Sequence, residues 1–312
     1  MAELAAEVRA GDRRALSRAL TLLESDETRA DALFTALAGQ AGRALRVGFT
    51  GPPGAGKSTL IEKLALRYRQ RGHRIGILAV DPTSPFTGGA LLGDRIRMGA
   101  LGGDPDVFLR SMATRGHRGG LAAVAVEAAD LLAIAGFDRL LVETVGVGQS
   151  ELEVAGAVHL VVVVLVPEAG DAVQSLKAGL TEIGDLIVVN KADRPGAEGF
   201  AAEVQEALAL RTGVERGLDP VPVLLTDARE GRGVDELMEA LEAAASGAGE
   251  RAAARRAGAL KARLLGLLGE GAERRAEEAL AGALDEEVEA ITAGRTTPRR
   301  AAGRLLARLL GG

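Results

Sequence analysis

The segment that most constrains this chain is Gly51-Pro52-Pro53-Gly54-Ala55-Gly56-Lys57-Ser58-Thr59, which fits the pattern G-x-x-x-x-G-K-[ST]. A short apolar run over residues 45–50 precedes it, and a helical pattern beginning at Leu60 follows it. In that context the loop turns its backbone N–H groups toward phosphates, and the helix N-terminus adds partial positive charge. The spacing predicts that Lys57 reaches the β- and γ-phosphates of a nucleotide and that the Ser58 hydroxyl ligates Mg²⁺.

The composition is that of a globular protein. The chain has 312 residues, 47% of them apolar and 26% charged. Aromatic residues make up 2% and the net charge is −5, which argues against base-stacking platforms and a nucleic-acid partner. There is no cysteine, so thiolate sites are excluded and a cytoplasmic location is expected. The most apolar run, Val158–Val166, is too short to span a bilayer, so no membrane association is expected.

Apolar runs alternate with helical patterns along the middle of the chain. This alternation predicts an α/β fold with a mainly parallel P-loop NTPase sheet flanked by helices. Ligands of such a sheet bind at the carboxyl ends of the strands. The expected strands are Arg46–Thr50, Ile75–Val80, Val107–Arg110, Arg139–Glu143, Leu160–Val166, Leu186–Asn190 and Val221–Leu225, with helices that include Leu60–Arg71, Gly120–Ala135 and Ala197–Leu210.

We expect three parts: an N-terminal helical segment (1–44), a P-loop domain (45–248) and a C-terminal helical segment (249–312). In the last part, leucines recur at helical spacing from Leu260, and a second helix is expected from Glu273. Gly294 and Pro298 interrupt the pattern before a final short helix. This segment is either a cap on the core or an arm that pairs with a second subunit, and we favour the arm.

Asn190-Lys191-Ala192-Asp193 follows an apolar strand and fits N-K-x-D, a pattern typical of guanine recognition. A carboxylate at Asp193 can accept two hydrogen bonds from the N1–H and exocyclic amine of guanine. Adenine offers no such pair, so the motif predicts GTP and GDP as ligands. Thr226-Asp227-Ala228, after the next expected strand, is predicted to close over the base.

Three acidic residues are candidates for the Mg²⁺ site. Asp81 ends an expected strand and could orient Mg²⁺, its waters or the attacking water. Asp94 follows a Gly-rich stretch, as in a mobile loop, although a helix N-cap is the alternative. Glu143 begins Glu143-Thr144-Val145-Gly146, where many GTPases carry D-x-x-G; there Gly146 would meet the γ-phosphate. Lys177, taken alone, has the pattern of a solvated helix lysine.

Taken in order, these motifs resemble the MeaB/ArgK family of P-loop GTPases, over essentially the whole chain. The segment Glu143-Thr144-Val145-Gly146-Val147-Gly148-Gln149-Ser150-Glu151 is the most specific, and it shows Glu where the family also has Glu. The other matching segments are residues 47–59, Ala79-Val80-Asp81-Pro82-Thr83-Ser84, Leu92-Gly93-Asp94-Arg95, residues 189–193, residues 10–19 and residues 297–302.

The resemblance implies a GTPase chaperone of an adenosylcobalamin-dependent acyl-CoA mutase, usually methylmalonyl-CoA mutase, and a homodimer joined through C-terminal helices. It implies that Lys57, Ser58, Asp81, Asp94 and Glu143 form the phosphate and Mg²⁺ site. It also places Lys177 in a switch that responds to the mutase, so the implied catalytic set is Lys57, Asp81 and Lys177. This sequence departs from the family pattern at residues 85–87, at residues 167–170 and at position 227, where Ser is usual.

Hydrolysis is expected to be slow alone and stimulated by the partner, because no built-in arginine finger is evident; Arg95, Arg97 and Arg115 are candidates. Two alternatives stay open. A small-molecule kinase would transfer the phosphoryl group to an amino acid instead of water. A nucleotide-dependent scaffold would bind GTP with negligible turnover.

Overall fold

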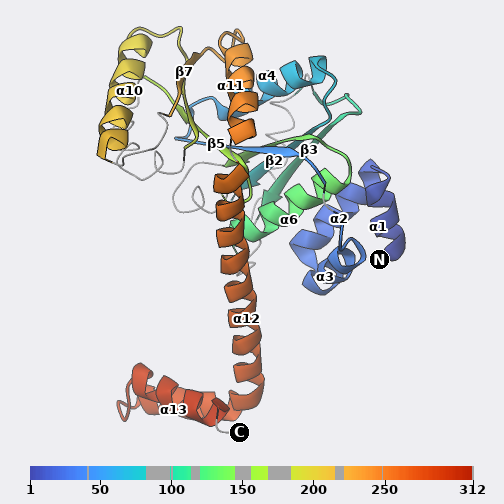
Figure 1. Ribbon diagram of the computed structural model, residues 1–312. Helices are drawn as coiled ribbons and strands as arrows, with labels where there is room; N and C mark the ends of the chain where they lie inside the picture. The colour runs from blue at the N-terminus through green and yellow to red at the C-terminus, as the bar shows by residue number, and fades with distance from the viewer. Residues whose placement is uncertain are drawn as a thin grey trace. The chain divides into compact units, whose positions relative to one another are not determined.

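A computed structural model of the protein describes residues 1–40, 42–81, 99, 101–113, 120–144, 156–167, 184–214, 221–247 and 249–310. The described strands form one seven-stranded parallel sheet (Figure 1). They are β1 (Leu45–Thr50), β2 (Ile75–Asp81), β3 (Val107–Ala113), β4 (Arg139–Thr144), β5 (Leu160–Leu165), β6 (Leu186–Asn190) and β7 (Val223–Thr226). The described helices are α1 (Ala2–Arg9), α2 (Arg13–Ser25), α3 (Glu27–Ala36), α4 (Lys57–Gln70), α6 (Gly120–Ile134), α10 (Ala197–Val214), α11 (Val234–Gly247), α12 (Gly249–Thr292) and α13 (Pro298–Leu310).

The strand order is β3-β2-β4-β1-β5-β6-β7, which puts β1 in the middle of the sheet. In its register, Val47 of β1 lies opposite Leu141 of β4 on one side and Leu160 of β5 on the other. All six residues of β5 are buried, as expected of a parallel strand covered on both faces. The predicted α/β fold is therefore confirmed, and every described strand pair is parallel.

Two apolar cores lie on the two faces of the sheet, because successive strand residues point to opposite sides. Val162 and Val164 of β5 join the core beneath α4 and α11, together with Leu64. Val161 and Val163 join the opposite core, which includes residues of α6, α10 and the three N-terminal helices. The N-terminal helices are thereby a second layer outside α6, as Figure 1 shows.

The predicted N-terminal helical segment is present as three helices. Asp12 caps the second of them, because its carboxylate accepts a hydrogen bond of 2.7 Å from the backbone N–H of Ala15. Leu16 and Leu20 are fully buried, and α2 packs against α6. This segment therefore belongs to the same compact unit as the sheet.

The C-terminal segment differs from the sequence prediction in one respect. We expected two helices before Gly294, but α12 is a single helix of 44 residues. Its glycines, such as Gly269 and Gly271, each cost about 1 kcal/mol relative to Ala, too little to break a run of strong helix formers. The chain divides within α12 into two compact units, Met1–Leu260 and Lys261–Gly312. The domain limits 45–248 and 249–312 stay predictions.

Candidate nucleotide-binding site

The phosphate-loop motif lies between the carboxyl end of β1 and the first turn of α4, in the middle of the sheet. Gly51 has φ of +134°, and a Cβ built on it would lie 2.1 Å from the backbone oxygen of Val164 in β5. Gly56 has φ of +86°, and a Cβ there would lie 2.4 Å from the side-chain nitrogen of Asn190. Both positions therefore require glycine, for backbone conformation and for space.

Lys57 is the first residue of α4, and its side chain folds back across the loop. Its Nζ donates to the backbone oxygens of Gly51 at 2.7 Å and Pro52 at 3.1 Å. The side chain is largely buried, so the ammonium group is held at the N-terminus of the helix by the loop itself. A positive charge and helix N–H groups converge there, which is the arrangement that binds phosphate.

Asn190, at the carboxyl end of β6, connects the phosphate loop to the loop after β7. Its amide nitrogen donates to the backbone oxygen of Ala55 at 2.8 Å. Its side-chain oxygen accepts two bonds of 3.0 Å, from the hydroxyl of Thr226 and from the backbone N–H of Ala228. Because Asn190 is 2% exposed, all three bonds are shielded from water. This one side chain thus links three of the predicted nucleotide-binding segments.

The other two residues of the N-K-x-D motif lie at the surface beside this link. Lys191 adopts φ of +61°, the left-handed conformation, so the chain turns sharply after β6. The backbone N–H of Ala192 donates to the Thr226 backbone oxygen at 2.9 Å, which holds that turn against the end of β7. The side chain of Asp193 is exposed, so its carboxylate is open to a ligand.

Asp227 has a structural role that the sequence did not reveal. Its carboxylate is buried and accepts bonds from the backbone N–H groups of Arg229 and Glu230 and from the Arg232 guanidinium at 2.8 Å. The bond from Arg232 lowers the pKa of the Asp227 carboxyl below its usual value. Asp227 therefore fixes the shape of the loop that carries Ala228.

Ser58 and Glu143 meet beside the phosphate loop. The Ser58 hydroxyl donates to Oε1 of Glu143 at 2.6 Å, joining the start of α4 to the carboxyl end of β4. The neighbouring Thr144 donates to the backbone oxygen of Phe49 at 3.2 Å, which ties β4 to β1 just before the loop. Hydroxyl and carboxylate oxygens are ligands that Mg²⁺ prefers, so the chemistry of this pair fits a magnesium ion.

The remaining predicted site residues can be placed only in part. Asp81 is the last residue of β2, paired in register with Ala113 of β3. Asp94, Gly146 and Lys177 lie outside the described residues, so the structure places none of them.

The sequence as a whole matches the family described as methylmalonyl Co-A mutase-associated GTPase MeaB, over residues 16–270. The chain belongs to the MeaB family. The resemblance stated from the motifs is thus confirmed.

Individual relatives of this MeaB-family chain agree with that assignment. A protein of Pyrococcus abyssi (strain GE5 / Orsay), whose name marks it as a candidate GTPase, is 49% identical over 242 residues, covering 77% of this chain and 74% of the relative. GTPase ArgK of Escherichia coli (strain K12) is 40% identical over 247 residues, covering 77% of this chain and 75% of the relative. A solved structure titled LAO/AO transport system kinase superposes with a TM-score of 0.70 at 29% identity, covering 99% of this chain and 97% of that one.

Among the described residues of this MeaB-family chain, no helix has the length and apolar character needed to cross a membrane.

Sequence reasoning missed two features of this region. The bracing role of Asn190 depends on β5 lying between β1 and β6, and the motif pattern alone does not give that order. A second cluster of charged residues, around Arg46, lies at the opposite end of β1. An arginine within an otherwise apolar strand was its only signal in the sequence.

Proposed function

We propose that this chain binds and hydrolyses GTP as a chaperone of an adenosylcobalamin-dependent acyl-CoA mutase. The expected partner is methylmalonyl-CoA mutase. The chaperone would gate the loading of the cofactor and protect the mutase. The observation that carries the proposal is the joining of the phosphate loop to the guanine motif through Asn190, in a chain of the mutase-associated MeaB family. Membership of that family supports the choice of partner.

The proposal assigns the phosphates to residues 51–59, with Lys57 neutralising charge on the β- and γ-phosphates. The base is assigned to Asn190, Lys191 and Asp193 and to the Thr226–Ala228 loop. Asp193 would accept hydrogen bonds from guanine, while Asn190 would hold the base loop and the phosphate loop at a fixed separation. Selectivity for GTP over ATP follows from the unpaired groups that adenine would leave.

The proposal assigns Mg²⁺ to Ser58 and Glu143, with Asp81 and Asp94 as further ligands or holders of its water shell. The ion would supply charge neutralisation at the phosphate oxygens. The Ser58 hydroxyl, which now donates to Glu143, would turn its oxygen lone pair toward the ion while Glu143 held the water shell.

Hydrolysis forms a bond from water oxygen to the γ-phosphorus and breaks the bond to the β–γ bridging oxygen, giving GDP and phosphate. We propose that this step is slow in the isolated protein and faster with the mutase. Lys57 is the one described cation that the loop holds at the phosphate position. The proposal also assigns to Lys177 a switch that responds to the mutase, and to Arg95, Arg97 or Arg115 the role of a finger that the mutase orders.

The test is hydrolysis of GTP and ATP by the full-length protein, with and without a cobalamin-dependent acyl-CoA mutase from the same source. GTP-selective release of phosphate that the mutase accelerates supports the proposal. Equal rates with and without the mutase would exclude the chaperone role but leave the GTPase, whereas a preference for ATP would exclude the role given to Asp193.

One solved relative favours a second candidate, because its title names a transport-system kinase. In that case the γ-phosphoryl group would pass to an amino acid or another small acceptor. Product analysis with γ-labelled GTP separates the two: label in free phosphate supports hydrolysis, and label on an added acceptor supports the kinase.

We also propose that the protein is a homodimer joined through its C-terminal segment. Leu264, Leu265 and Leu268 of α12 are 61%, 60% and 69% exposed, and leucines at 260, 264 and 268 form a stripe at helical spacing. Light scattering of the double variant Leu264→Glu/Leu268→Glu should give a monomer. Val288→Glu, on a different face of the same helix by spacing, is the control and should stay dimeric; a dimeric double variant would exclude this interface.

A further inference from the structure

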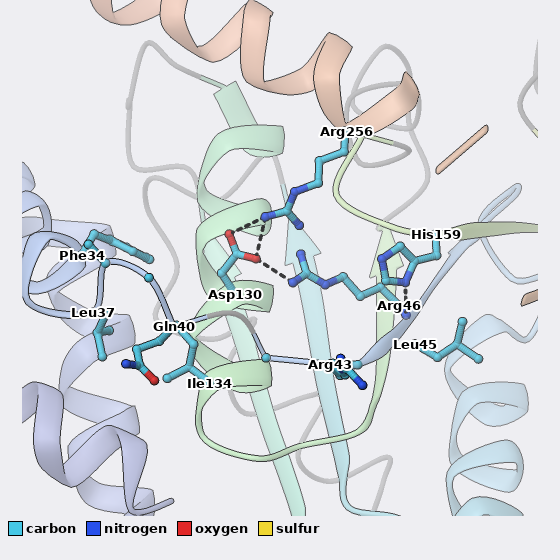
Figure 2. Close-up of a pocket in the computed structure, with 14 residues that line it drawn as sticks. Phe34, Leu37, Gln40, Arg43, Leu45, Arg46, Asp130, Ile134, His159 and Arg256 are labelled. Atoms are coloured by element: carbon cyan, nitrogen blue, oxygen red, sulfur yellow. Dashed lines mark hydrogen bonds and ion pairs between the residues drawn. The ribbon is translucent and has the colours of Figure 1, made fainter. Parts of the chain in front are cut away.

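A pocket lies at the amino-terminal ends of β1 and β5, at the edge of the sheet opposite the phosphate loop (Figure 2). Its volume is about 800 Å³, within the range of small-molecule sites. The linker between α3 and β1, helix α6 and the start of α12 form its walls, and all of them belong to the unit Met1–Leu260. Gly42 of the linker lies so close to α6 that a Cβ on it would be 2.1 Å from the backbone carbon of Ala133.

Arg46 of β1 brings a buried positive charge to this pocket. The residue is 4% exposed, and its Nη2 pairs with Oδ1 of Asp130 in α6 at 2.6 Å. Its Nε and Nη1 are buried and have no hydrogen-bond partner among the described residues. A buried guanidinium N–H without an acceptor destabilises the fold, so these two donors call for an acceptor.

Asp130 cannot neutralise the cluster alone, because it is shared. Arg256, near the start of α12, also pairs with Oδ1 of Asp130, at 3.1 Å, and both guanidinium groups converge on this carboxylate in Figure 2. Arg43 lines the same pocket and is exposed, and Asp130 is the one acidic residue among the lining residues. Among the described residues that line it, the pocket therefore has three guanidinium groups and one carboxylate.

His159, just before β5, adds a further donor. Its Nδ1 accepts a hydrogen bond of 3.1 Å from the backbone N–H of Arg46, so the proton of the neutral ring is on Nε2. Burial, and then the charges of Arg46, Arg256 and Arg255, lower the pKa of His159 to about 4. The ring is thus neutral at physiological pH, because burial first and the neighbouring guanidinium charges second disfavour its charged form.

Apolar side chains also line the pocket. Phe34 and Leu37 of the α3 end, Leu45 at the start of β1 and Ile134 at the end of α6 all line the pocket. A charged group held at Arg46 would therefore have an apolar surface beside it. Apolar walls with a few convergent polar groups are typical of small-molecule sites.

We propose that this pocket binds a small organic anion, a carboxylate or phosphate ester with a compact apolar body. Its oxygens accept hydrogen bonds from Arg46 and Arg256 and its body packs against Phe34 and Ile134. The planar guanidinium fork matches both kinds of anion. The ligand would lie between β1 and the first turns of α12, so it would strengthen the attachment that Arg256 makes to α6.

The test uses four probes on the full chain, with GDP and Mg²⁺ in excess so that the phosphate loop is filled. Benzoate and phenyl phosphate carry both a charge and an apolar body. Inorganic phosphate lacks the body, and benzyl alcohol lacks the charge. We expect calorimetric titration to show benzoate, phenyl phosphate or both binding at least tenfold tighter than either partial probe. The probe that binds tighter identifies the head group.

Matched charge reversals locate the binding. Arg43→Glu should weaken the tighter probe at least tenfold, while Arg14→Glu, the same change at an exposed position of α2, should alter its affinity less than twofold. Ile134→Trp, which fills the pocket without changing charge, should also abolish binding. Three results would overturn the proposal. Neither benzoate nor phenyl phosphate binds below about 10 mM, benzyl alcohol binds as tightly as they do, or Arg43→Glu and Arg14→Glu change the affinity equally. None of these outcomes bears on GTP hydrolysis.

Discussion

The sharpest prediction concerns Asn190, because one side chain makes three buried hydrogen bonds. Asn190→Ala removes the bonds to Ala55, Thr226 and Ala228 and leaves their backbone oxygen, hydroxyl and N–H unpaired. At about 1 kcal/mol for each bond, the free energy of unfolding should fall by about 3 kcal/mol. Thr226→Val removes only one of the three and should cost about 1 kcal/mol.

Urea unfolding of the full chain, followed by circular dichroism, measures these differences. A fluorescent GDP analogue measures the second effect: loss of the bond to Ala55 frees the phosphate loop, and GDP affinity should fall about tenfold, or about 1.4 kcal/mol. Asn190→Asp separates the effect on the phosphate loop from the effect on the loop after β7. It keeps both bonds that the side-chain oxygen accepts but places a negative charge against the Ala55 oxygen. It should weaken GDP binding as much as Asn190→Ala.

The reasoning would be refuted if Asn190→Ala lost no more stability than Thr226→Val. It would also be refuted if Asn190→Asp bound GDP like the wild type, because the bond to Ala55 would then carry no part of the phosphate-loop geometry.

Three further predictions follow from the same structure. Gly56→Ala places a methyl group 2.4 Å from the Asn190 amide and should weaken GDP binding at least tenfold. The control is Gly72→Ala, at a glycine with φ of +85° and open space around it, which should leave GDP binding unchanged in the same titration. Asp193→Asn should lower the affinity for GTP and raise that for xanthosine triphosphate, measured by competition with the fluorescent analogue, because an amide donates where the carboxylate accepted. The pKa of His159 is about 4 in the folded protein and 6.5 in the unfolded chain, so the unfolded state binds the proton first. The free energy of unfolding should therefore fall as pH drops from 6.5 to 4, and His159→Gln should remove that part of the pH dependence in urea unfolding.

The central strands, such as β5 and β6, could be predicted from the sequence because they are buried on both faces. A continuous apolar run such as Leu186–Val189 has few alternatives when a helical pattern follows it. The start of β7 was set two residues too early, at Val221 instead of Val223. Pro222 intervenes and has no N–H to donate to the ladder, although its carbonyl accepts from Ile187.

The candidate site could be predicted only where its residues are local in sequence. The phosphate loop and the N-K-x-D pattern are short segments with fixed spacing, so their residues could be named. The bond from Asn190 to Ala55 joins positions 135 residues apart, and no local pattern reports it. The bonds that the Asp227 carboxylate accepts from Arg232 and two backbone N–H groups had no signal in the motif either, and the predicted closing of its loop over the base stays a prediction.

Ligands at the two ends of β1 should act on different parts of the protein. At the carboxyl end, Asn190 bonds directly to the phosphate loop and to the base loop, so a displacement of one must strain the other. At the amino end, the described contacts of the Arg46 side chain lead to Asp130 in α6, away from the nucleotide. Between them β1 is paired in register with β4 and β5, so the strand is held on both sides. Coupling between two sites requires an alternative arrangement of the element that joins them, and we expect none for a strand held in this way. A ligand beside Arg46 should therefore act on the attachment of α12, while the nucleotide acts on the loops at the opposite edge.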